Sequence, residues 1–384
     1  MKIDPYNHKQ KYLAWKARIN GVFPNVSKEN SDIFTQYLND MEIGANVSVK
    51  NVKGGRSFNR LNHLREKLGF FARQFEIRFN LNKITDINEM QLITFFSDMK
   101  NGLIKKNDGT TYSSIDTFSK IFKSFWHWYV KVSKKKAVEI QDITVDLDTR
   151  AEKPDWVYLT EDQVKQLAES SKYEYKVLIL FLYDTGIRAP TELINVRVSD
   201  LINDCKELNI REEISKTFGR RIKLMLCSDL LKEYIKNKKL KPEDQLFDIS
   251  PSVVNRQLKR SAINLFGTGT SPAGQKYSDL SMYDFRHCSC CYWLPKYKSE
   301  SALKYRFGWK KSDKIHYYSE LLGMSDTISE EDLLIDTTKT ELEKRLEKSE
   351  REKELIEDRM KNMEFQMAKI LELTNHLGLE VKND

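Results

Sequence analysis

Six residues in the second half of this 384-residue chain have side chains suited to phosphoryl transfer. In chain order they are Arg188, Lys216, Arg286, Trp309, Tyr317 and Tyr318. A tyrosine hydroxyl can attack a phosphodiester once cations neutralise the non-bridging oxygens, and arginine binds such oxygens with paired hydrogen bonds. A lysine can protonate the leaving 5′ oxygen, and an indole N–H can donate a further hydrogen bond. Such a set would need no metal ion, because phosphoryl transfer depends mainly on positioning and charge.

Each residue also has an ordinary interpretation when taken alone. Arg188 follows Gly186 and precedes Pro190 in "LFLYDTGIRAPTELINV", where a helix is expected to break, and it could simply form a salt bridge there. Lys216 could be a solvated turn residue, and adjacent aromatic residues in a helix usually pack. The order Arg, Lys, Arg, Trp, Tyr within one basic region is what indicates catalysis.

The same stretches resemble the motifs of the tyrosine recombinase (phage integrase) family. "TGIRAPTELINVRVSDL" is similar to the first-arginine box, "SKTFGRRIKL" to the hairpin lysine box, and "FGWKKSDKIHYYSEL" to the nucleophile box. "YDFRHCS" resembles the H-x-x-R-H box with Tyr283 in place of the first histidine, as in some archaeal and viral members. The resemblance runs from about Lys28 to Gly323. It implies cleavage and rejoining of DNA through a 3′-phosphotyrosine intermediate, without a metal or cofactor.

The resemblance also assigns roles within the site. It implies catalytic residues Arg188, Lys216, Tyr283, Arg286, Trp309 and Tyr318. The family's nucleophile lies nine residues after the Trp309 position, which selects Tyr318, whereas Tyr317 is rotated by ~100° on the helix. Tyr283 can donate to a phosphate, but a phenol with a pKa near ~10 is a poor proton shuttle. The Arg188–Glu192 spacing is one residue longer than the family pattern, which leaves a supporting role of Glu192 open.

The charge distribution favours a polyanionic partner. The chain has a net charge of +8, yet residues 325–384 contain 10 Lys and Arg against 17 Asp and Glu, so the preceding 324 residues have a net charge of +15. The alternative is that the positive charge serves only to keep the protein soluble. The resemblance implies double-stranded DNA as the partner, bound largely through its phosphates. The candidate contacts are Lys131, Lys134, Lys135, Lys136, Arg220, Arg221, Lys310 and Lys311.

Several protein classes are disfavoured. No segment approaches the ~20 apolar residues of a membrane span, and the first residues do not resemble a secretion signal. Five cysteines indicate reduced thiols, so we expect a cytoplasmic, nucleoid-associated protein. The run "HCSCC" has no second Cys/His pair for zinc, and "GTGTSPAG" lacks the lysine of a phosphate-binding loop.

We expect a mainly α-helical protein with a small antiparallel β-hairpin or sheet, of the α+β class. Helical spacing of Leu61, Leu64, Leu68 and Phe71 typifies the first half, and Thr160 with Gln163 predicts a capping box. Leu208 and Ile210, then Ile222, Leu224 and Leu226, alternate on either side of a turn, which predicts the hairpin. The predicted segments are an N-terminal extension (1–27), a helical core-binding domain (28–138), a linker (139–159), a catalytic domain (160–324) and an acidic tail (325–384).

From Leu342 to Leu377 the tail has a seam at alternating steps of four and three, which is apolar at all but Ser349, Lys353 and Thr374. This heptad pattern predicts a self-associating coiled coil, although a single helix folded back on the body would have the same pattern. The resemblance implies a synaptic tetramer on DNA. Three alternatives to the recombinase remain: a type IB topoisomerase-like enzyme, a catalytically silent DNA-binding protein of the same fold, and a coiled-coil adaptor.

Overall fold

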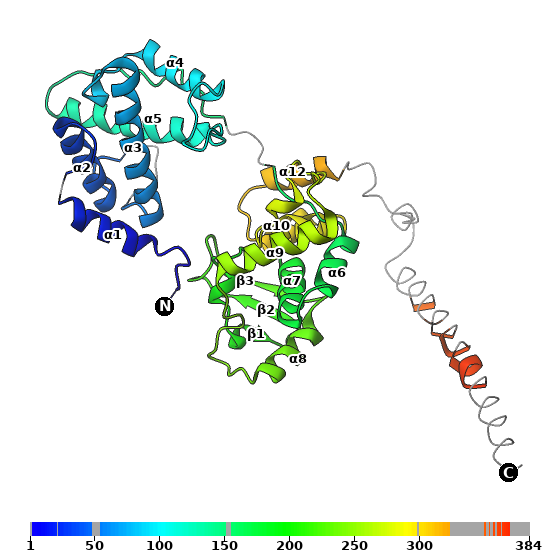
Figure 1. Ribbon diagram of the computed structural model, residues 1–384. Coiled ribbons are helices and arrows are strands. Elements are labelled where there is room, and N and C mark those ends of the chain that lie inside the picture. The colour runs from blue at the N-terminus through cyan, green and yellow to red at the C-terminus, as the bar shows by residue number, and fades with distance from the viewer. Residues whose placement is uncertain are drawn as a thin grey trace, which may run out of the picture. The chain divides into compact units, whose positions relative to one another are not determined.

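The computed structural model describes residues 2–20, 22–47, 54–150, 155–297 and 299–322, with scattered residues between 349 and 368. The helices that precede residue 136 gather in one body (Figure 1), residues 2–150, which we call the helical body. The three strands lie among the remaining helices in residues 155–322, which we call the sheet body. The predicted α+β class with a small antiparallel sheet is confirmed. None of the described helices has the length and apolar character needed to cross a membrane.

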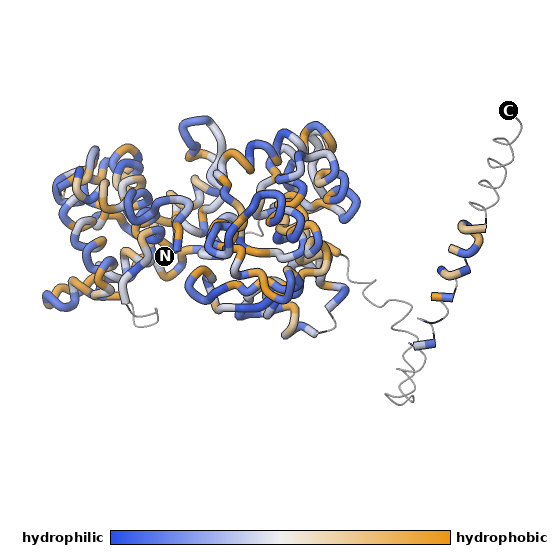
Figure 2. The backbone as a smooth tube through the Cα atoms, turned by 90° about the horizontal axis from the view of Figure 1, so that it is seen from below, coloured by the Kyte–Doolittle hydropathy of each residue, from blue (hydrophilic) through white to orange (hydrophobic). Residues whose placement is uncertain are grey.

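The helical body is built around aromatic side chains. Its helices are α1 (His8–Ile19), α2 (Lys28–Ile43), α3 (Phe58–Phe79), α4 (Glu89–Lys100) and α5 (Ile115–Lys135), with a 3₁₀ turn at Ile84–Asp86. The predicted face of α3 is buried at Leu61, Leu64, Leu68 and Phe71. The rings of Phe71 and Phe122 meet edge to face at 5.2 Å, an arrangement that adds to the burial of apolar area. Figure 2 shows apolar residues recurring along these helices.

Two predicted boundaries differ from the structure. Tyr12 and Trp15 of α1 are buried with the helical core, so the first 27 residues include part of this body rather than a separate extension. Described residues at both ends of the predicted linker (139–159) contact the folded bodies. Trp126 Nε1 donates to the carbonyl of Gln141 at 3.0 Å, which ties the start of the linker to α5. At its other end Trp156 is buried in the sheet body. Apolar residues at both ends of the segment explain this packing.

The sheet body surrounds a three-stranded antiparallel sheet of order β1-β2-β3. Its strands are β1 (Leu201–Ile202), β2 (Glu207–Ile210) and β3 (Arg220–Lys223). Its helices are α6 (Glu161–Glu169), α7 (Tyr173–Thr185), α8 (Ser228–Lys238), α9 (Pro251–Phe266), α10 (Asp284–Trp293), α11 (Glu300–Phe307) and α12 (Asp313–Leu321), with 3₁₀ turns at Leu193–Asn195, Val198–Asp200 and Tyr277–Asp279. The capping box predicted for Thr160 and Gln163 is present at the start of α6.

The predicted hairpin is confirmed, with Leu208 opposite Ile222 in the register. The alternation does not extend to Leu226, because β3 ends at Lys223 and Leu226 is exposed. The strand ends at Lys223 because the buried carboxylate of Asp184 accepts the backbone N–H groups of Met225, Leu226 and Cys227. The same carboxylate pairs with Arg306 at 2.9 Å, so the ends of α7, β3 and α11 meet at one buried ion pair.

Most of the predicted coiled coil lies outside the described residues. The described residues of the tail are helical, and Ile356, Met360, Met363 and Met367 expose more than half of their surface. Self-association through the tail stays a prediction.

Candidate active site

Arg188 lies in the irregular segment that follows α7. The helix ends at Gly186, which has a left-handed φ of 56° and donates its N–H to the carbonyl of Leu182. A Cβ at this position would lie 2.3 Å from a ring carbon of Phe307, so only glycine fits. Arg188 therefore leaves the helix close to the end of α11. Its Nη2 donates to the carbonyl of Gly308 at 2.7 Å.

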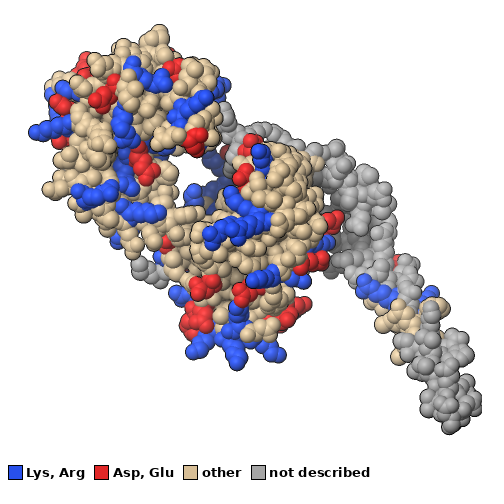
Figure 3. Space-filling model, viewed as in Figure 1, with Lys and Arg blue, Asp and Glu red and all other residues tan. Residues whose placement is uncertain are grey.

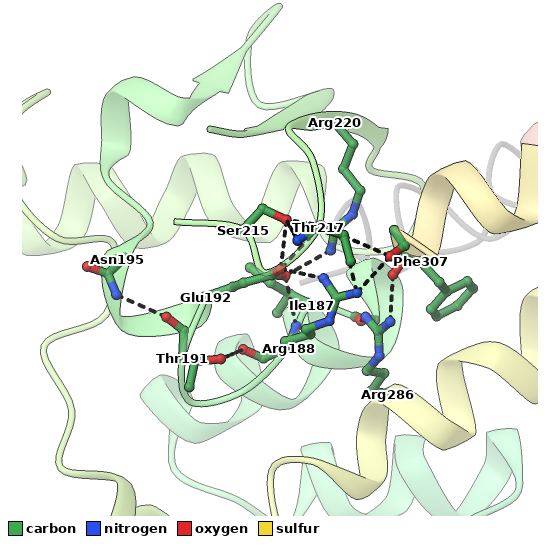
Figure 4. Close-up of polar contacts among 12 residues, drawn as sticks. Ile187, Arg188, Thr191, Glu192, Asn195, Ser215, Thr217, Arg220, Arg286 and Phe307 are labelled. Atoms are coloured by element: carbon green, nitrogen blue, oxygen red, sulfur yellow. Dashed lines mark hydrogen bonds and ion pairs between the residues drawn. The ribbon is translucent and has the colours of Figure 1, made fainter. Parts of the chain in front are cut away.

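Glu192 links Arg188 to a second arginine, Arg220 (Figure 4). Its carboxylate accepts from Arg188 Nη1 at 2.7 Å and from Arg220 Nη2 at 2.8 Å. Burial by itself would raise the pKa of Glu192, but the hydrogen bonds and charges of Arg220 and Arg188 outweigh it and lower the pKa to about 2. The sequence had left a supporting role of Glu192 open. The structure gives it one, because the longer spacing still brings the carboxylate back to Arg188.

The predicted DNA contact Arg220 is a buried structural residue instead. This residue is 2% exposed, and its Nε donates to the carbonyl of Arg306 at 2.9 Å. With Nη1 and Nη2 both on Glu192, the guanidinium is committed to the interior. We therefore remove Arg220 from the proposed DNA contacts. Sequence reasoning missed this role although the signal was present, because a period of two places Arg220 on the same face as the buried Ile222.

Arg286 approaches the same point from α10. Its guanidinium is buried and donates to the carbonyls of Gly186 at 2.6 Å and Phe307 at 2.5 Å. Burial, together with the nearby charge of Arg188, lowers the pKa of Arg286 to about 10, so it remains cationic at neutral pH. Arg188 and Arg286 thus converge on the backbone of Phe307 and Gly308, directly before Trp309.

Trp309 connects the arginines to the tyrosines. Its ring stacks on Phe307 with centroids 4.9 Å apart, and on Tyr318 with centroids 5.8 Å apart and planes 13° from parallel. The guanidinium carbon of Arg286 lies 5.7 Å from the Trp309 ring centroid. The structure therefore brings Arg286, Trp309 and Tyr318 into one cluster, although they come from α10, the α11–α12 turn and α12.

Tyr318 is the more deeply buried of the two adjacent tyrosines. It is 3% exposed, whereas Tyr317 is half-buried. Burial raises the pKa of the Tyr318 hydroxyl well above its usual value, and the charge of Arg286 opposes this only in part. The hydroxyl lies 2.5 Å from His287 Nδ1. His287 was not selected from the sequence, although its position four residues after Tyr283 places both on one helix face.

Lys216 is exposed in the loop between β2 and β3. The residues on either side of it tie this loop to the arginines. Ser215 Oγ donates to Glu192 at 3.3 Å, and Thr217 Oγ1 donates to the carbonyl of Gly308 at 2.9 Å. Tyr283 lies at the start of α10 and is 45% exposed, with its ring centroid 5.3 Å from that of His287.

The other predicted contacts lie on the surface to different degrees. Exposed side chains belong to Lys134, Lys135, Lys136, Arg221, Lys310 and Lys311. Lys131 is partly buried and donates to the carbonyl of Val47 at 2.7 Å. Figure 3 shows basic side chains over the visible face of both bodies, with acidic ones between them.

The run "HCSCC" lies on α10, where Cys288, Cys290 and Cys291 are buried. Within the described part of the chain, no group of three or more His, Cys, Asp or Glu residues could hold a metal ion. Cys288 instead accepts the backbone N–H of Leu159 at 3.3 Å, and burial raises the pKa of its thiol well above the usual value.

Residues 157–323 match the model of the phage integrase family and form a domain of that family. No curated protein sequence matches the chain.

Solved structures share the fold at low identity. A fragment of the Tn1549 transposon integrase in complex with circular intermediate DNA is 16% identical with a TM-score of 0.53, covering 77% of this chain and 95% of that one. A lambda integrase dimer bound to a COC′ core site is 15% identical with a TM-score of 0.51, covering 79% and 80%. A lambda integrase tetramer bound to a Holliday junction is 13% identical with a TM-score of 0.50, covering 79% and 80%.

Proposed function

We propose that the protein is a site-specific DNA recombinase that cleaves and rejoins strands through a phosphodiester bond to Tyr318. The observation that supports this most strongly is the convergence of Arg188 and Arg286 on the backbone of Phe307 and Gly308. This places two cations next to Trp309, whose ring stacks on Tyr318. Cations beside a phenol are what an in-line attack on a phosphodiester needs.

The roles follow from the placement of each group. Arg188 and Arg286 bind the non-bridging oxygens, and Trp309 donates its indole N–H to one of them. Lys216 on its exposed loop protonates the leaving 5′ oxygen as Tyr318 forms the 3′-phosphotyrosine. Tyr283 is exposed enough to donate a hydrogen bond to the same phosphate.

Pre-organised charge is the main source of rate in this scheme. Glu192 is itself anionic, yet it holds Arg188 through two contacts, from the backbone N–H at 3.1 Å and from Nη1 at 2.7 Å. A fixed guanidinium loses little side-chain entropy when the phosphate arrives, which favours the transition state. Tyr318 is buried, and its ring stacks on Trp309 beside Arg286, so we expect the scissile phosphate to approach from the side of the arginines.

Double-stranded DNA is the proposed partner, and self-association on it is proposed as well. The similar integrases were solved with DNA, one as a dimer on a core site and one as a tetramer on a Holliday junction. Strand exchange joins two duplexes, so an assembly of four copies suits the reaction. The exposed Lys134, Lys135 and Lys136, Arg221, Lys310 and Lys311 are the proposed phosphate contacts. We further propose that the protein acts on DNA at the nucleoid, in the cytoplasm.

A nicked suicide duplex tests the chemistry. The nick lets the short strand diffuse away after cleavage, which traps the covalent intermediate. We expect a protein–DNA adduct that forms without magnesium and maps by peptide mass to Tyr318. Tyr318→Phe abolishes it and Tyr317→Phe does not, because Tyr317 is rotated away on α12. DNA cleavage that needs magnesium and leaves no linked protein would overturn the proposal.

The runner-up is a type IB topoisomerase-like enzyme, which would form a similar adduct. The two are separated by giving the protein two duplex sites on one supercoiled plasmid. A recombinase yields deletion or inversion products, whereas a topoisomerase yields only relaxed plasmid. The position of the adduct is the same in both cases, so this assay is needed in addition to the first.

A further inference from the structure

His287 supplies an imidazole to the site from one helical turn beyond Tyr283. Residues four apart on a helix lie on one face, and the two rings meet edge to face with centroids 5.3 Å apart. Tyr283 occupies the position where the family resemblance leads us to expect a histidine. His287 is the second histidine of this box, so the box keeps one imidazole although its first position is a tyrosine.

The imidazole is held in a fixed orientation. Its ring stacks on Trp156 with centroids 4.7 Å apart and planes 27° from parallel. Trp156 is itself fixed by its backbone, which donates to the carbonyl of Ala273 at 3.2 Å and accepts from Ser271 Oγ at 3.2 Å. Trp156 also contacts the Tyr318 ring edge to face. This packing directs Nδ1 at the Tyr318 hydroxyl, 2.5 Å away.

We propose that His287 is the base that takes the proton of Tyr318 during strand cleavage, an inference that rests on the proposed function. As the phenolic oxygen bonds to phosphorus, its proton passes to His287 Nδ1. The bond from phosphorus to the 5′ oxygen breaks, and that oxygen takes a proton from Lys216. Rejoining reverses each transfer: the 5′ hydroxyl attacks the phosphotyrosine, and His287 returns its proton to the departing phenolate.

Neighbouring groups are poorer candidates for this proton. Burial raises the pKa of the Tyr318 hydroxyl, so attack near neutral pH requires a base in contact with it. The nearby carboxylate of Asp284 accepts from the backbone of Val157 at 3.1 Å and of Ser281 at 2.7 Å, which engages both of its oxygens. Tyr283 is a phenol like the nucleophile and offers no gain in basicity. An imidazole changes its charge near neutral pH.

His287→Asn is the decisive variant. An asparagine Oδ1 takes the place of Nδ1, so it keeps an acceptor for the Tyr318 hydroxyl but cannot take up the proton. With the full-length protein and the nicked suicide duplex, we expect adduct formation to slow by about 10²- to 10³-fold in single turnover. The matched control is His316→Asn, because His316 is exposed on the same helix as Tyr318. We expect its rate to equal that of the unmodified protein.

A modified substrate separates the two proton transfers. A 5′-bridging sulfur in place of the leaving oxygen departs without protonation, so it restores cleavage by Lys216→Ala. It does not restore cleavage by His287→Asn, because the nucleophile's proton still has no acceptor. Restoration of both variants by the sulfur substrate would contradict the assignment of His287.

The remaining outcomes are also decisive. His287→Ala leaves a space into which free imidazole can diffuse, and we expect millimolar imidazole to restore adduct formation at least tenfold. Cleavage by His287→Asn within about twofold of the unmodified protein would overturn the inference. Loss of DNA binding by both His287 variants would assign the imidazole to the fold instead and would overturn it too. Failure of the unmodified protein to form any adduct would count against the proposed function itself.

Discussion

The carboxylate of Glu192 accepts hydrogen bonds from the guanidinium of Arg220 at 2.8 and 3.3 Å, and both side chains are buried. The same carboxylate holds Arg188, so one anion neutralises a buried cation and orients a second one toward the site. A buried carboxylate in this position couples the stability of the fold to the geometry of catalysis.

Glu192→Gln should therefore lower both stability and activity. The amide keeps one acceptor but removes the charge opposite Arg220, and the loss of one partner of a buried ion pair is costly. We expect a decrease of about 2–4 kcal/mol in the free energy of unfolding, measured by urea denaturation. Glu212→Gln is the control, because Glu212 is exposed on the loop that follows β2. Equal midpoints for the two variants would contradict this role.

The depressed pKa of Glu192 also predicts that the stability of the fold depends on pH. The pKa falls from the usual 4.5 to about 2 on folding, so the carboxylate contributes its full stability above pH 4.5. That contribution is lost progressively as the pH falls from 4.5 towards 2. Denaturation midpoints between pH 5 and pH 3 should fall more steeply for the unmodified protein than for Glu192→Gln. Parallel curves would show that Glu192 does not titrate in this way.

Arg220 and Arg221 are adjacent in the sequence, but their substitutions should change different properties. We expect loss of stability for Arg220 and weaker DNA binding for Arg221. Arg220→Gln leaves Glu192 without its buried partner, and we expect the free energy of unfolding to fall by about 3 kcal/mol. Arg221 is exposed, so Arg221→Gln should leave stability unchanged and weaken DNA binding. Removing one phosphate contact should reduce the slope of log affinity against log salt by about 1.

Salt titrations of DNA binding and urea denaturation of the same two preparations provide the measurement. A lower urea midpoint for Arg221→Gln, or an unchanged urea midpoint for Arg220→Gln, would contradict the structure.

Gly186→Ala should disturb the site through the backbone. A Cβ would lie 2.3 Å from Phe307 and 2.9 Å from Ser289 Oγ, at a left-handed φ of 56°. We expect a loss of about 1–3 kcal/mol in stability and slower adduct formation, because Phe307 and Gly308 carry the carbonyls that hold both arginines. Gly109→Ala is the control: Gly109 has a φ of 79°, but its Cβ would meet nothing within 4 Å.

Adduct rates and thermal unfolding of the two alanine variants measure this effect. Strain from φ alone would lower stability equally in both variants. A larger defect for Gly186→Ala isolates the clash with Phe307.

The sequence by itself determined the fold class and the residues of the site's motifs. Leu61, Leu64, Leu68 and Phe71 recur at helical spacing, and such a pattern can bury only one face of a helix. The alternation of Leu208 and Ile210 identified the hairpin for the same reason with a period of two. Local structure of this kind can be predicted from the sequence because neighbouring residues share one backbone geometry.

Only the tertiary structure decided how charged residues pair. It supplied the partner of the buried Arg220 by bringing Glu192 onto both Arg188 and Arg220. It also set His287 against Tyr318 across 31 residues of sequence. Burial of a charge depends on partners from other elements, because an ion leaves water only where a partner offsets its lost hydration. The spacing of residues along the sequence does not identify that partner.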